Sequence, residues 1–206
     1  MARKMAERRE ALRETLIDLA EARIARDGMT AIKARDLARE AGCAVGAIYN
    51  VFADLEELVI AVNGRTFRRL GAAVASRLEG AEDRPATARL VLIADAYLQF
   101  ATDHPRLWRT VFDLQMSVNT PVPGWYLTEM QNLFEIISDP LREIFPDWDA
   151  DQIGLMTRAL FSSVHGIVLL GLENRISAVP QDYLRQMIAL LITRTTHPGI
   201  PASEIF

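Results

Sequence analysis

The chain has 206 residues, of which half are hydrophobic and 24% are charged, and its net charge is −4. This balance excludes a highly charged disordered chain and predicts a folded globular protein with one ordinary core, or a small domain joined to a larger one. No run of 18 uninterrupted apolar residues is present, so we expect no membrane span.

The beginning of the chain is basic. Its first ten residues, MARKMAERRE, are not followed by the apolar stretch of a secretory signal, and the lone Cys43 cannot form an internal disulfide. We therefore expect a cytoplasmic protein. Residues 1–52 have a charge of +2 and residues 53–206 a charge of −6. A protein that offers one end to a polyanion has this asymmetry, although a solvated helix face explains so small a surplus equally well.

Apolar residues recur at intervals of three and four along the chain, which predicts an all-α fold. A first helix ends near Gly28, where glycine can adopt the left-handed conformation of a helix stop. A short helix then ends at Gly42, and another begins near Val45 and runs to Val51. A fourth helix starts near Asp54, which is a good N-cap because Glu57 follows at the spacing of a capping box.

The clearest joint in the chain is the charged segment EGAEDRPATAR at residues 79–89. Beyond it, apolar periodicity predicts five further helices, separated by proline-containing segments. Their expected ranges are 86–103, 105–116, 124–145, 149–173 and 180–196. We expect the tail, HPGIPASEIF, to be irregular.

A short helix, a glycine turn and a second short helix between two long helices form the outline of a helix-turn-helix domain. Residues 34–58, ARDLAREAGCAVGAIYNVFADLEEL, resemble the DNA-binding domain of the TetR family of transcriptional regulators, whose pattern runs roughly I-A-x-x-A-G-V-S-x-G-T-L-Y-x-Y-F-x-S-K-E-E-L. The residues that match this pattern, in register and without a gap, are Leu37, Ala38, Ala41, Gly42, Gly46, Ile48, Tyr49, Phe52, Glu56, Glu57 and Leu58.

The resemblance continues into the second half. DHPRLWRTVF and SSVHGIVLLGLENRI are similar to segments in the ligand-binding half of one TetR-like group, where a tryptophan often precedes a His-Gly pair; here Phe161 precedes His165 and Gly166. The resemblance implies a helix-turn-helix DNA-binding domain at 1–54, with its motif at about 33–52. A connecting helix and linker at 55–84 and a helical ligand-binding and dimerisation domain at 85–206 follow.

Several residues are candidates to contact DNA. The resemblance implies that Tyr49 reaches the phosphate backbone, with a purely core role as the alternative. Asn50 can hydrogen-bond an adenine edge, and Val45 and Ala47 can meet thymine methyl groups. Arg35 suits a phosphate, although an exposed arginine is often only solvated. The predicted DNA-binding residues are Arg3, Lys4, Lys33, Arg35, Val45, Gly46, Ala47, Tyr49 and Asn50.

Three positions depart from the family pattern. Ala44 replaces a serine and so removes a side-chain N-cap worth about 1 kcal/mol. Ala47 replaces a threonine and loses a hydroxyl, and Leu55 replaces a lysine that would contact phosphate. Because phosphate contacts dominate DNA affinity, we expect the N-terminal Arg/Lys cluster, with Lys33 and Arg35, to supply it. Simple solubility or disorder explains residues 1–8 equally well.

The second half is rich in aromatic side chains. Most should be core, and the resemblance implies that some line a cavity for a small apolar or aromatic effector. His165 is either the polar group that holds the effector in this cavity or a core histidine whose hydrogen bonds are made within the protein, the latter being the commoner case. The predicted ligand-binding residues are Tyr97, Phe100, Trp108, Phe112, Met116, Trp125, Phe134, Phe161 and His165.

The last two predicted helices are apolar enough to need a partner, and the resemblance implies that they form a homodimer interface. A two-fold dimer places two recognition helices about one DNA turn apart, ~34–36 Å, and calls for a palindromic operator. The predicted interface residues are Ile153, Met156, Leu160, Val164, Val168, Tyr183, Met187, Leu190 and Leu191.

The resulting hypothesis is a transcriptional regulator, by family default a repressor, that an effector releases from DNA by pushing the helix at about 105–116 against the fourth helix. The alternative is a TetR-like ligand-binding protein that has lost DNA binding. We do not expect an enzyme, a metal or a cofactor, because no metal-ligand spacing, phosphate-binding loop, dinucleotide-binding glycine pattern or G-x-S-x-G motif is present.

Overall fold

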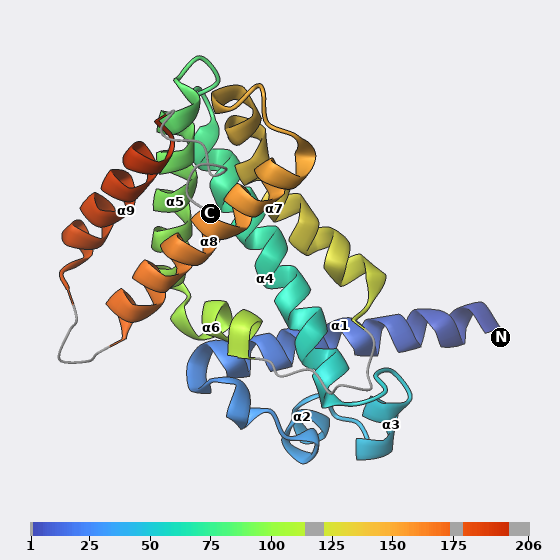
Figure 1. The fold of residues 1–206 in the computed structure, drawn as a ribbon. Helices are drawn as coiled ribbons and strands as arrows, with labels where there is room; N and C mark the ends of the chain where they lie inside the picture. The colour runs from blue at the N-terminus through green and yellow to red at the C-terminus, as the bar shows by residue number, and fades with distance from the viewer. Residues whose placement is uncertain (1, 114–121, 174–178, 198–206) are drawn as a thin grey trace. The chain divides into compact units, whose positions relative to one another are not determined.

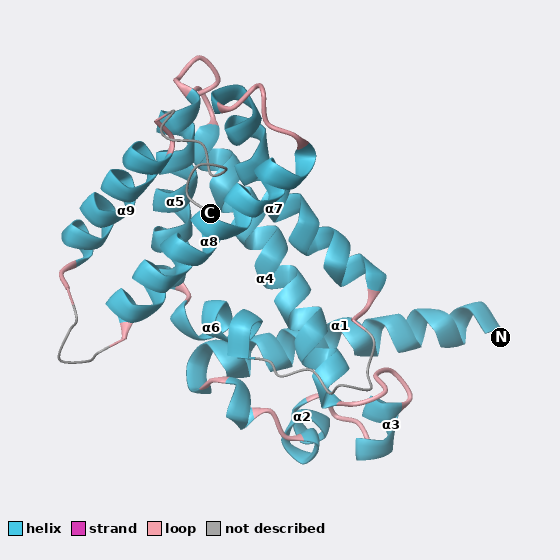
Figure 2. Cartoon of the chain, in the orientation of Figure 1, coloured by secondary structure: helices cyan, strands magenta, loops and turns pink. Residues whose placement is uncertain are grey.

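The computed structural model describes residues 2–113, 122–173 and 179–197. Within these residues the chain forms α-helices and one short 3-10 helix, and no strand (Figure 2). The all-α prediction is confirmed. The helices labelled in Figure 1 are α1 (Ala2–Asp27), α2 (Ala34–Glu40), α3 (Val45–Tyr49), α4 (Leu55–Leu78), α5 (Ala86–Asp103), α6 (Pro105–Asp113), α7 (Gly124–Ile144), α8 (Ala150–Leu172) and α9 (Gln181–Thr195).

The predicted helix ranges agree closely with the structure for α5, α7, α8 and α9, whose ends differ by at most one residue. Two expectations need correction. The recognition helix α3 ends at Tyr49 instead of Val51, and the residues from 2 onward, for which disorder was one alternative, belong to α1. The end of the predicted helix 105–116, from residue 114, and the tail from residue 198 lie outside the described residues.

Glycines and a capping aspartate set the ends of the N-terminal helices. Gly28 has φ +85° and Gly42 has φ +64°, a conformation that carries little penalty only for glycine. At the start of α4 the main-chain N–H of Glu57 donates to Asp54 Oδ1 over 2.7 Å, and Glu57 Oε2 accepts from the N–H of Ala53 over 2.6 Å. The expected cap at Asp54 is therefore present.

Contacts divide the chain into two compact units. Unit 1 comprises Met1–Arg69 and Asp103–Glu129, and unit 2 comprises Leu70–Thr102 and Met130–Phe206. Helices α4 and α7 each contribute residues to both units. The three-part domain division expected from the sequence stays a prediction, but α6 belongs to unit 1, the unit of the helix-turn-helix residues.

Unit 1 is built around one apolar core. Leu107 of α6 belongs to the same buried cluster as residues from α1, α2, α3 and α4. Side chains from all five helices meet there because each helix has one apolar face. The largest of its fully or almost fully buried members are Leu16, Ile24, Leu37, Ile48, Phe52 and Leu58.

Ion pairs on α1 reinforce this core. Arg65 of α4 reaches three carboxylates of α1, with distances of 2.6 Å to Glu14, 2.5 Å to Asp18 and 3.4 Å to Glu21. The Arg65 side chain is only 19% exposed. A bridging guanidinium of this kind suits several planar carboxylates at once, so α1 and α4 are held together as a pair.

Unit 2 contains α5, α8 and α9. Helix α8 begins with a capping box between Asp149 and Gln152 and packs along α9, where Gly171 leaves no room for a Cβ atom against Leu184. By length and composition alone α8 is apolar enough to cross a membrane, a test that a core helix of a soluble protein also passes. Here one face of α8 lies in the core of the unit.

Candidate nucleic-acid interface and effector site

The turn between α2 and α3 is tightly hydrogen-bonded. The N–H of Cys43 donates to the carbonyl of Ala38 over 2.9 Å, and Gly42 supplies the positive φ that this arrangement requires. Ala44 follows in an extended conformation, and α3 begins at Val45. The sequence from Ala34 to Tyr49 therefore forms a helix, a tight turn and a second helix, as expected for a helix-turn-helix motif.

Helix α3 presents one face to solvent and one to the core. Ile48 is fully buried, whereas Tyr49 is 50% exposed and Val45 is 38% exposed. Gly46 and Asn50 are also exposed, and Ala47 is half-buried. The structure thus brings the predicted base-contacting residues of α3 together on its accessible side. Their contact with DNA stays a prediction.

The N-terminus of α3 has no side-chain cap. Ala44 occupies the N-cap position, and no side chain accepts a hydrogen bond from the first turn. The only hydrogen bond described at this end is main-chain, from the N–H of Ala47 to the carbonyl of Ala44 over 2.9 Å. The departure noted in the sequence therefore leaves the recognition helix without one of its usual stabilising bonds.

Leu55, the residue that replaces a family lysine, has a structural role. It is half-buried and packs against the core cluster of unit 1. An apolar side chain here contributes burial in place of a phosphate contact. This position is therefore part of the scaffold that carries the motif.

The predicted basic residues are exposed. Arg3 and Lys4 lie on the first turn of α1, and Arg3 pairs with Glu7 at 2.9 Å. Lys33 is the N-cap residue of α2, and Arg35 lies in its first turn. All four are accessible to a phosphate backbone, and at the exposed surface the Arg3–Glu7 pair is a weak competitor.

Sequence reasoning missed Arg23, which joins α1 to α2. Its guanidinium lies 2.5 Å from Glu40 and 3.6 Å from Asp36, and it donates to the carbonyl of Ala31 over 3.3 Å. The hydrogen bond from Arg23 lowers the pKa of Glu40. No short-range sequence pattern indicates the role of Arg23, because its partners lie eight to seventeen positions away.

The predicted ligand-binding residues are divided between the two units. Trp108, Phe112 and Trp125 belong to unit 1, and Met116 lies outside the described residues. The others, in unit 2, are Tyr97, Phe100, Phe134, Phe161 and His165. The predicted set therefore has members in both units, and their binding of a ligand stays a prediction.

The cluster in unit 2 centres on a hydrogen bond between Tyr97 of α5 and His165 of α8. Tyr97 Oη lies 2.8 Å from His165 Nδ1, and the imidazole stacks on Phe161 with a centroid distance of 5.7 Å. Phe134 meets Phe161 edge to face at 5.1 Å, and the Arg158 guanidinium lies 5.8 Å from the Phe134 ring centroid. This is an aromatic patch with one polar pair and one nearby cation.

Burial lowers the pKa of His165 below its ordinary value of 6.5. The imidazole is therefore neutral at pH 7, with one nitrogen as donor and the other as acceptor. In a neutral histidine either ring nitrogen can carry the proton, so the direction of the hydrogen bond to the phenol is not fixed. The Tyr97–His165 pair can therefore present a hydrogen-bond donor or an acceptor to a third group.

The cluster in unit 1 surrounds a buried amide. Asn63 of α4 is fully buried, and its Nδ2 donates to the carbonyl of Thr110 on α6 over 3.2 Å. Tyr126 lies beside Asn63, and burial raises the pKa of its phenol. Phe67 and Trp125 pack on Tyr126 at 5.1 and 5.7 Å. Asn63 thus joins α4 to α6 within the unit that carries the motif.

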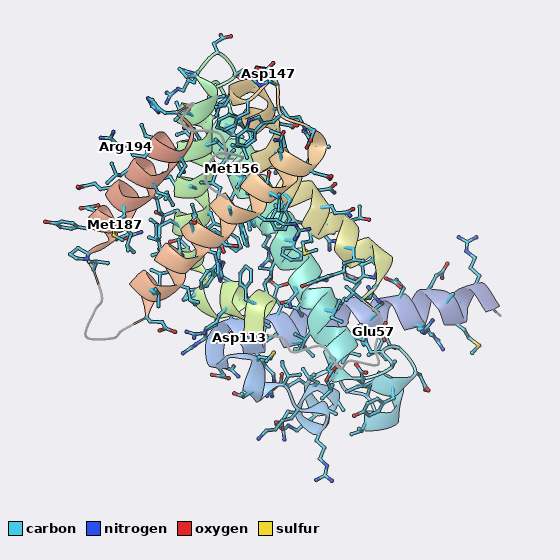
Figure 3. The ribbon with its side chains drawn as sticks, in the orientation of Figure 1. Glu57, Asp113, Asp147, Met156, Met187 and Arg194 are labelled. Atoms are coloured by element: carbon cyan, nitrogen blue, oxygen red, sulfur yellow. The ribbon has the colours of Figure 1, made fainter. Side chains whose placement is uncertain are left out.

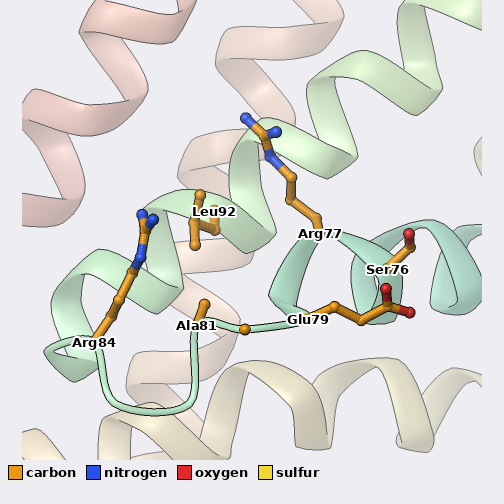
Figure 4. Close-up of a pocket in the computed structure, with 7 residues that line it drawn as sticks. Ser76, Arg77, Glu79, Ala81, Arg84 and Leu92 are labelled. Carbon is orange, nitrogen blue, oxygen red and sulfur yellow. The ribbon is translucent and has the colours of Figure 1, made fainter.

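A cavity of about 410 Å³ opens where α4 turns into α5 (Figure 4). Its lining includes Arg77, Arg84 and Glu79, and Gly80 takes φ +70° at the turn. None of the predicted ligand-binding residues lines it. The polar, charged lining differs from the apolar one expected for an aromatic effector.

The predicted dimer residues on α8 are mostly in the core, which is a correction. Four of them are at most 6% exposed: Ile153, Leu160, Val164 and Val168. A partner chain has no access to side chains that unit 2 already buries. Met156 and, on α9, Leu191 are half-buried.

The exposed face of α8 has apolar residues at its ends and small ones between. Leu155 is 70% exposed and Leu170 is 61% exposed, and the positions between them on the same face are Ala159, Ser162 and Gly166. These residues recur at intervals of three and four and so share one face. Small residues permit close approach of a second helix.

On α9 three predicted interface residues are exposed. Tyr183 is 59%, Met187 43% and Leu190 60% exposed, and their spacing places them on one face. Figure 3 labels Met187 and Arg194 on this helix. Both α8 and α9 therefore carry apolar side chains that the described residues of unit 2 leave exposed.

The fold and the motif define a helix-turn-helix DNA-binding protein, and comparison with family models identifies its family. Residues 16–62 match the model described as bacterial regulatory proteins, tetR family, and residues 90–194 match the tetracyclin repressor-like C-terminal domain. The chain belongs to the TetR family. Its family and fold are those of transcription regulators, and DNA binding through the helix-turn-helix motif goes with them.

Solved structures have the same fold. A protein of unknown function from Rhodococcus sp. RHA1 is 25% identical, with a TM-score of 0.73 over 89% of this chain and 94% of that one. RolR in complex with resorcinol is 23% identical, with a TM-score of 0.68 over 97% and 93%. FadR from Bacillus subtilis in complex with stearoyl-CoA is 18% identical, with a TM-score of 0.66 over 89% and 99%. No curated protein sequence matches.

Proposed function

We propose that this protein is a cytoplasmic, homodimeric repressor that binds a palindromic operator and leaves it when a small aromatic effector binds. The observation that carries the DNA-binding part is the division of α3, with Ile48 in the core and Val45, Tyr49 and Asn50 accessible. A helix fixed by its buried face and free on the other can enter a major groove. Exposed Arg3, Lys4, Lys33 and Arg35 would contact phosphates.

The dimer would form through the exposed faces of α8 and α9. Leu155 and Leu170 on α8, with Tyr183, Met187 and Leu190 on α9, are large apolar side chains left in water by a single chain. Covering several such side chains in a two-fold interface removes this exposure. The proposed interface keeps the α9 part of the sequence prediction and replaces its α8 part.

The effector would bind at the unit 2 cluster. Phe161 and Phe134 offer aromatic faces, and the Tyr97–His165 pair offers a hydrogen-bonding group among them. A small aromatic molecule with a hydroxyl group matches this chemistry, because it can stack and exchange a hydrogen bond at the same site. RolR was solved with such a molecule, resorcinol.

The signal would reach the motif through α5 and α6. Tyr97 lies on α5, which is followed directly by α6, and α6 is tied to α4 by the Asn63–Thr110 bond. An effector that favours one position of α5 would shift α6 and with it the helix that follows the motif. The effector can shift this equilibrium only by its differential affinity for the two states.

Selection of random duplexes on purified protein tests the DNA-binding part. At low salt we expect enrichment of a palindrome whose half-sites lie about one helical turn apart. Failure to enrich any palindrome would support the alternative, a TetR-like ligand-binding protein that has lost DNA binding.

A thermal-shift screen of simple phenols, beginning with resorcinol, tests the effector part. A compound that stabilises the protein should also weaken binding to the selected duplex in proportion to its saturation. The control variant is Tyr97→Phe, which keeps the ring and removes the hydroxyl. A compound that stabilises the protein but leaves DNA affinity unchanged at every concentration contradicts the mechanism.

A further inference from the structure

The recognition helix is weakly held at its beginning. Helix α3 has only five residues and no side-chain N-cap at Ala44. A helix this short is marginal without tertiary support, because nucleation is costly and few hydrogen bonds repay it. Ile48 provides one buried anchor, and the orientation of the helix needs at least one more fixed point.

The other end of α3 is contacted by two arginines of α1. Arg9 Nε donates to the main-chain carbonyl of Asn50, the C-cap residue of α3, over 2.9 Å. The Arg13 guanidinium carbon lies 5.4 Å from the ring centroid of Phe52. Arg9 and Arg13 are four residues apart and so lie on the same face of α1. Both reach the segment that immediately follows the recognition helix.

A guanidinium suits this place electrostatically. The last carbonyls of a helix have no intrahelical donor, and the C-terminal end carries partial negative charge. A cationic donor satisfies one carbonyl and interacts favourably with the dipole. The cation over the face of Phe52, which is 1% exposed, adds an attraction to a side chain already fixed in the core.

We propose that Arg9, assisted by Arg13, is a positioning residue that sets the orientation of the recognition helix from its C-terminal end and so offsets the missing N-cap. This inference rests on the proposed DNA binding. It assigns Arg9 a role different from that of the other N-terminal basic residues, which would act as phosphate contacts. It also accounts for the helical turns of α1 that precede its core residues, because these turns place Arg9 beside the carbonyl of Asn50.

The two roles predict different behaviour. Loss of a phosphate contact weakens binding to all duplexes and lowers the slope of log affinity against log salt by about 1. Loss of a positioning contact leaves that slope unchanged and lowers affinity for the selected operator more than for random DNA. A positioning contact also affects the free protein, whereas a phosphate contact does not.

The test compares Arg9→Met with Arg8→Met, which makes the same chemical change at the neighbouring exposed arginine. Without DNA, we expect the amides of Val51 and Phe52 to exchange about three- to tenfold faster in Arg9→Met, as after loss of one solvent-exposed hydrogen bond, and at the wild-type rate in Arg8→Met. Unchanged exchange in Arg9→Met overturns the proposal, and this result requires no operator.

DNA binding supplies the second readout, with the duplex that the wild-type protein selects from random sequences. For Arg9→Met we expect a loss of operator affinity with the wild-type salt slope, and partial recovery in Ala44→Ser/Arg9→Met because the added hydroxyl restores an N-cap. Ala44→Ser alone is the control. A slope reduced by about 1 without recovery identifies a phosphate contact and overturns the proposal. If no duplex is selected, the proposed function fails, while the exchange result still decides the role of Arg9.

Discussion

Tyr97 Oη and His165 Nδ1 lie 2.8 Å apart and join α5 to α8 within unit 2. Burial lowers the pKa of His165, so the pair is held in its neutral form. A polar pair among the aromatic rings of Phe161 and Phe134 keeps hydrogen-bonding capacity inside an otherwise apolar cluster. Its protonation therefore affects both stability and the proposed effector site.

The stability of the protein should fall with acidification through His165. In the unfolded chain the imidazole has its ordinary pKa near 6.5, whereas in the folded chain the pKa is lower. Below about pH 6.5 the unfolded state binds more protons, so the free energy of unfolding decreases as the pH falls from about 7 to about 5. His165→Gln should remove this part of the pH dependence. Chemical denaturation of the wild-type protein and of His165→Gln across this range measures it.

Asn63 should be required for coupling but not for effector binding. Asn63→Leu removes the hydrogen bond to Thr110 and leaves a buried carbonyl with one donor fewer, which costs about 1–3 kcal/mol of stability. We expect effector affinity close to wild type, measured by calorimetry, and a reduced effect of effector on DNA affinity. Thr66→Val changes another buried polar side chain of α4 and serves as control. Full release of Asn63→Leu from DNA by effector would contradict this role.

Asn50 and Tyr49 should affect DNA binding differently. Asn50→Ala removes a base-reading amide and should relax preference at one operator position by about 1–3 kcal/mol, without disturbing the main-chain carbonyl that Arg9 contacts. Tyr49→Phe removes only a hydroxyl and should weaken binding to all duplexes by the same factor. Competition binding with single-base operator variants distinguishes them, and an equal loss on every duplex for Asn50→Ala would rule out base readout.

Leu190→Glu should break the proposed dimer. The side chain is 60% exposed in a single chain, so a charge there costs the folded monomer little but is buried in the interface. Thr195→Glu adds the same charge to α9 at an exposed position on a different face from Tyr183, Met187 and Leu190. Sedimentation should show a monomer for the first variant and a dimer for the second. A dimer in both variants would mean that the chains associate through a surface other than the exposed face of α9.

Ala44→Ser should stabilise the protein by about 1 kcal/mol, because residue 44 already has the extended conformation of an N-cap and a serine hydroxyl can accept from the first turn of α3. Thermal unfolding measures the gain. Ala75→Ser, at an exposed position inside α4, should give no gain, since no unpaired N–H is available there. Equal effects at the two positions would show that the cap does not form.

Local patterns predicted the helices well because their causes are local. Gly28 and Gly42 end helices through their positive φ, and Asp54 begins one through its side chain. The grouping of α6 with unit 1 was not predictable in this way. Leu107 looks like any apolar helix residue, and only the folded chain shows that it joins the core around Leu16 and Ile48.

Periodicity also misplaced the dimer residues of α8 for a physical reason. The strongest apolar face of a helix, here containing Leu160 and Val168, is the one that its own domain buries. The exposed face has large apolar residues only at its two ends, with Ala159, Ser162 and Gly166 between them, so its average apolarity is lower. Similarly, the Arg9–Asn50 bond spans 41 positions, and nothing in the sequence near either residue indicates it.

The burial of Leu55 has a consequence for engineering. A designer who wished to tighten DNA binding by consensus would replace Leu55 with the lysine common in the family. In this chain that change exchanges packing against the core of unit 1 for a charge at a half-buried site, so the gain in operator affinity would be offset by a less stable scaffold. Consensus substitutions transfer between relatives only where the receiving position faces the same surroundings.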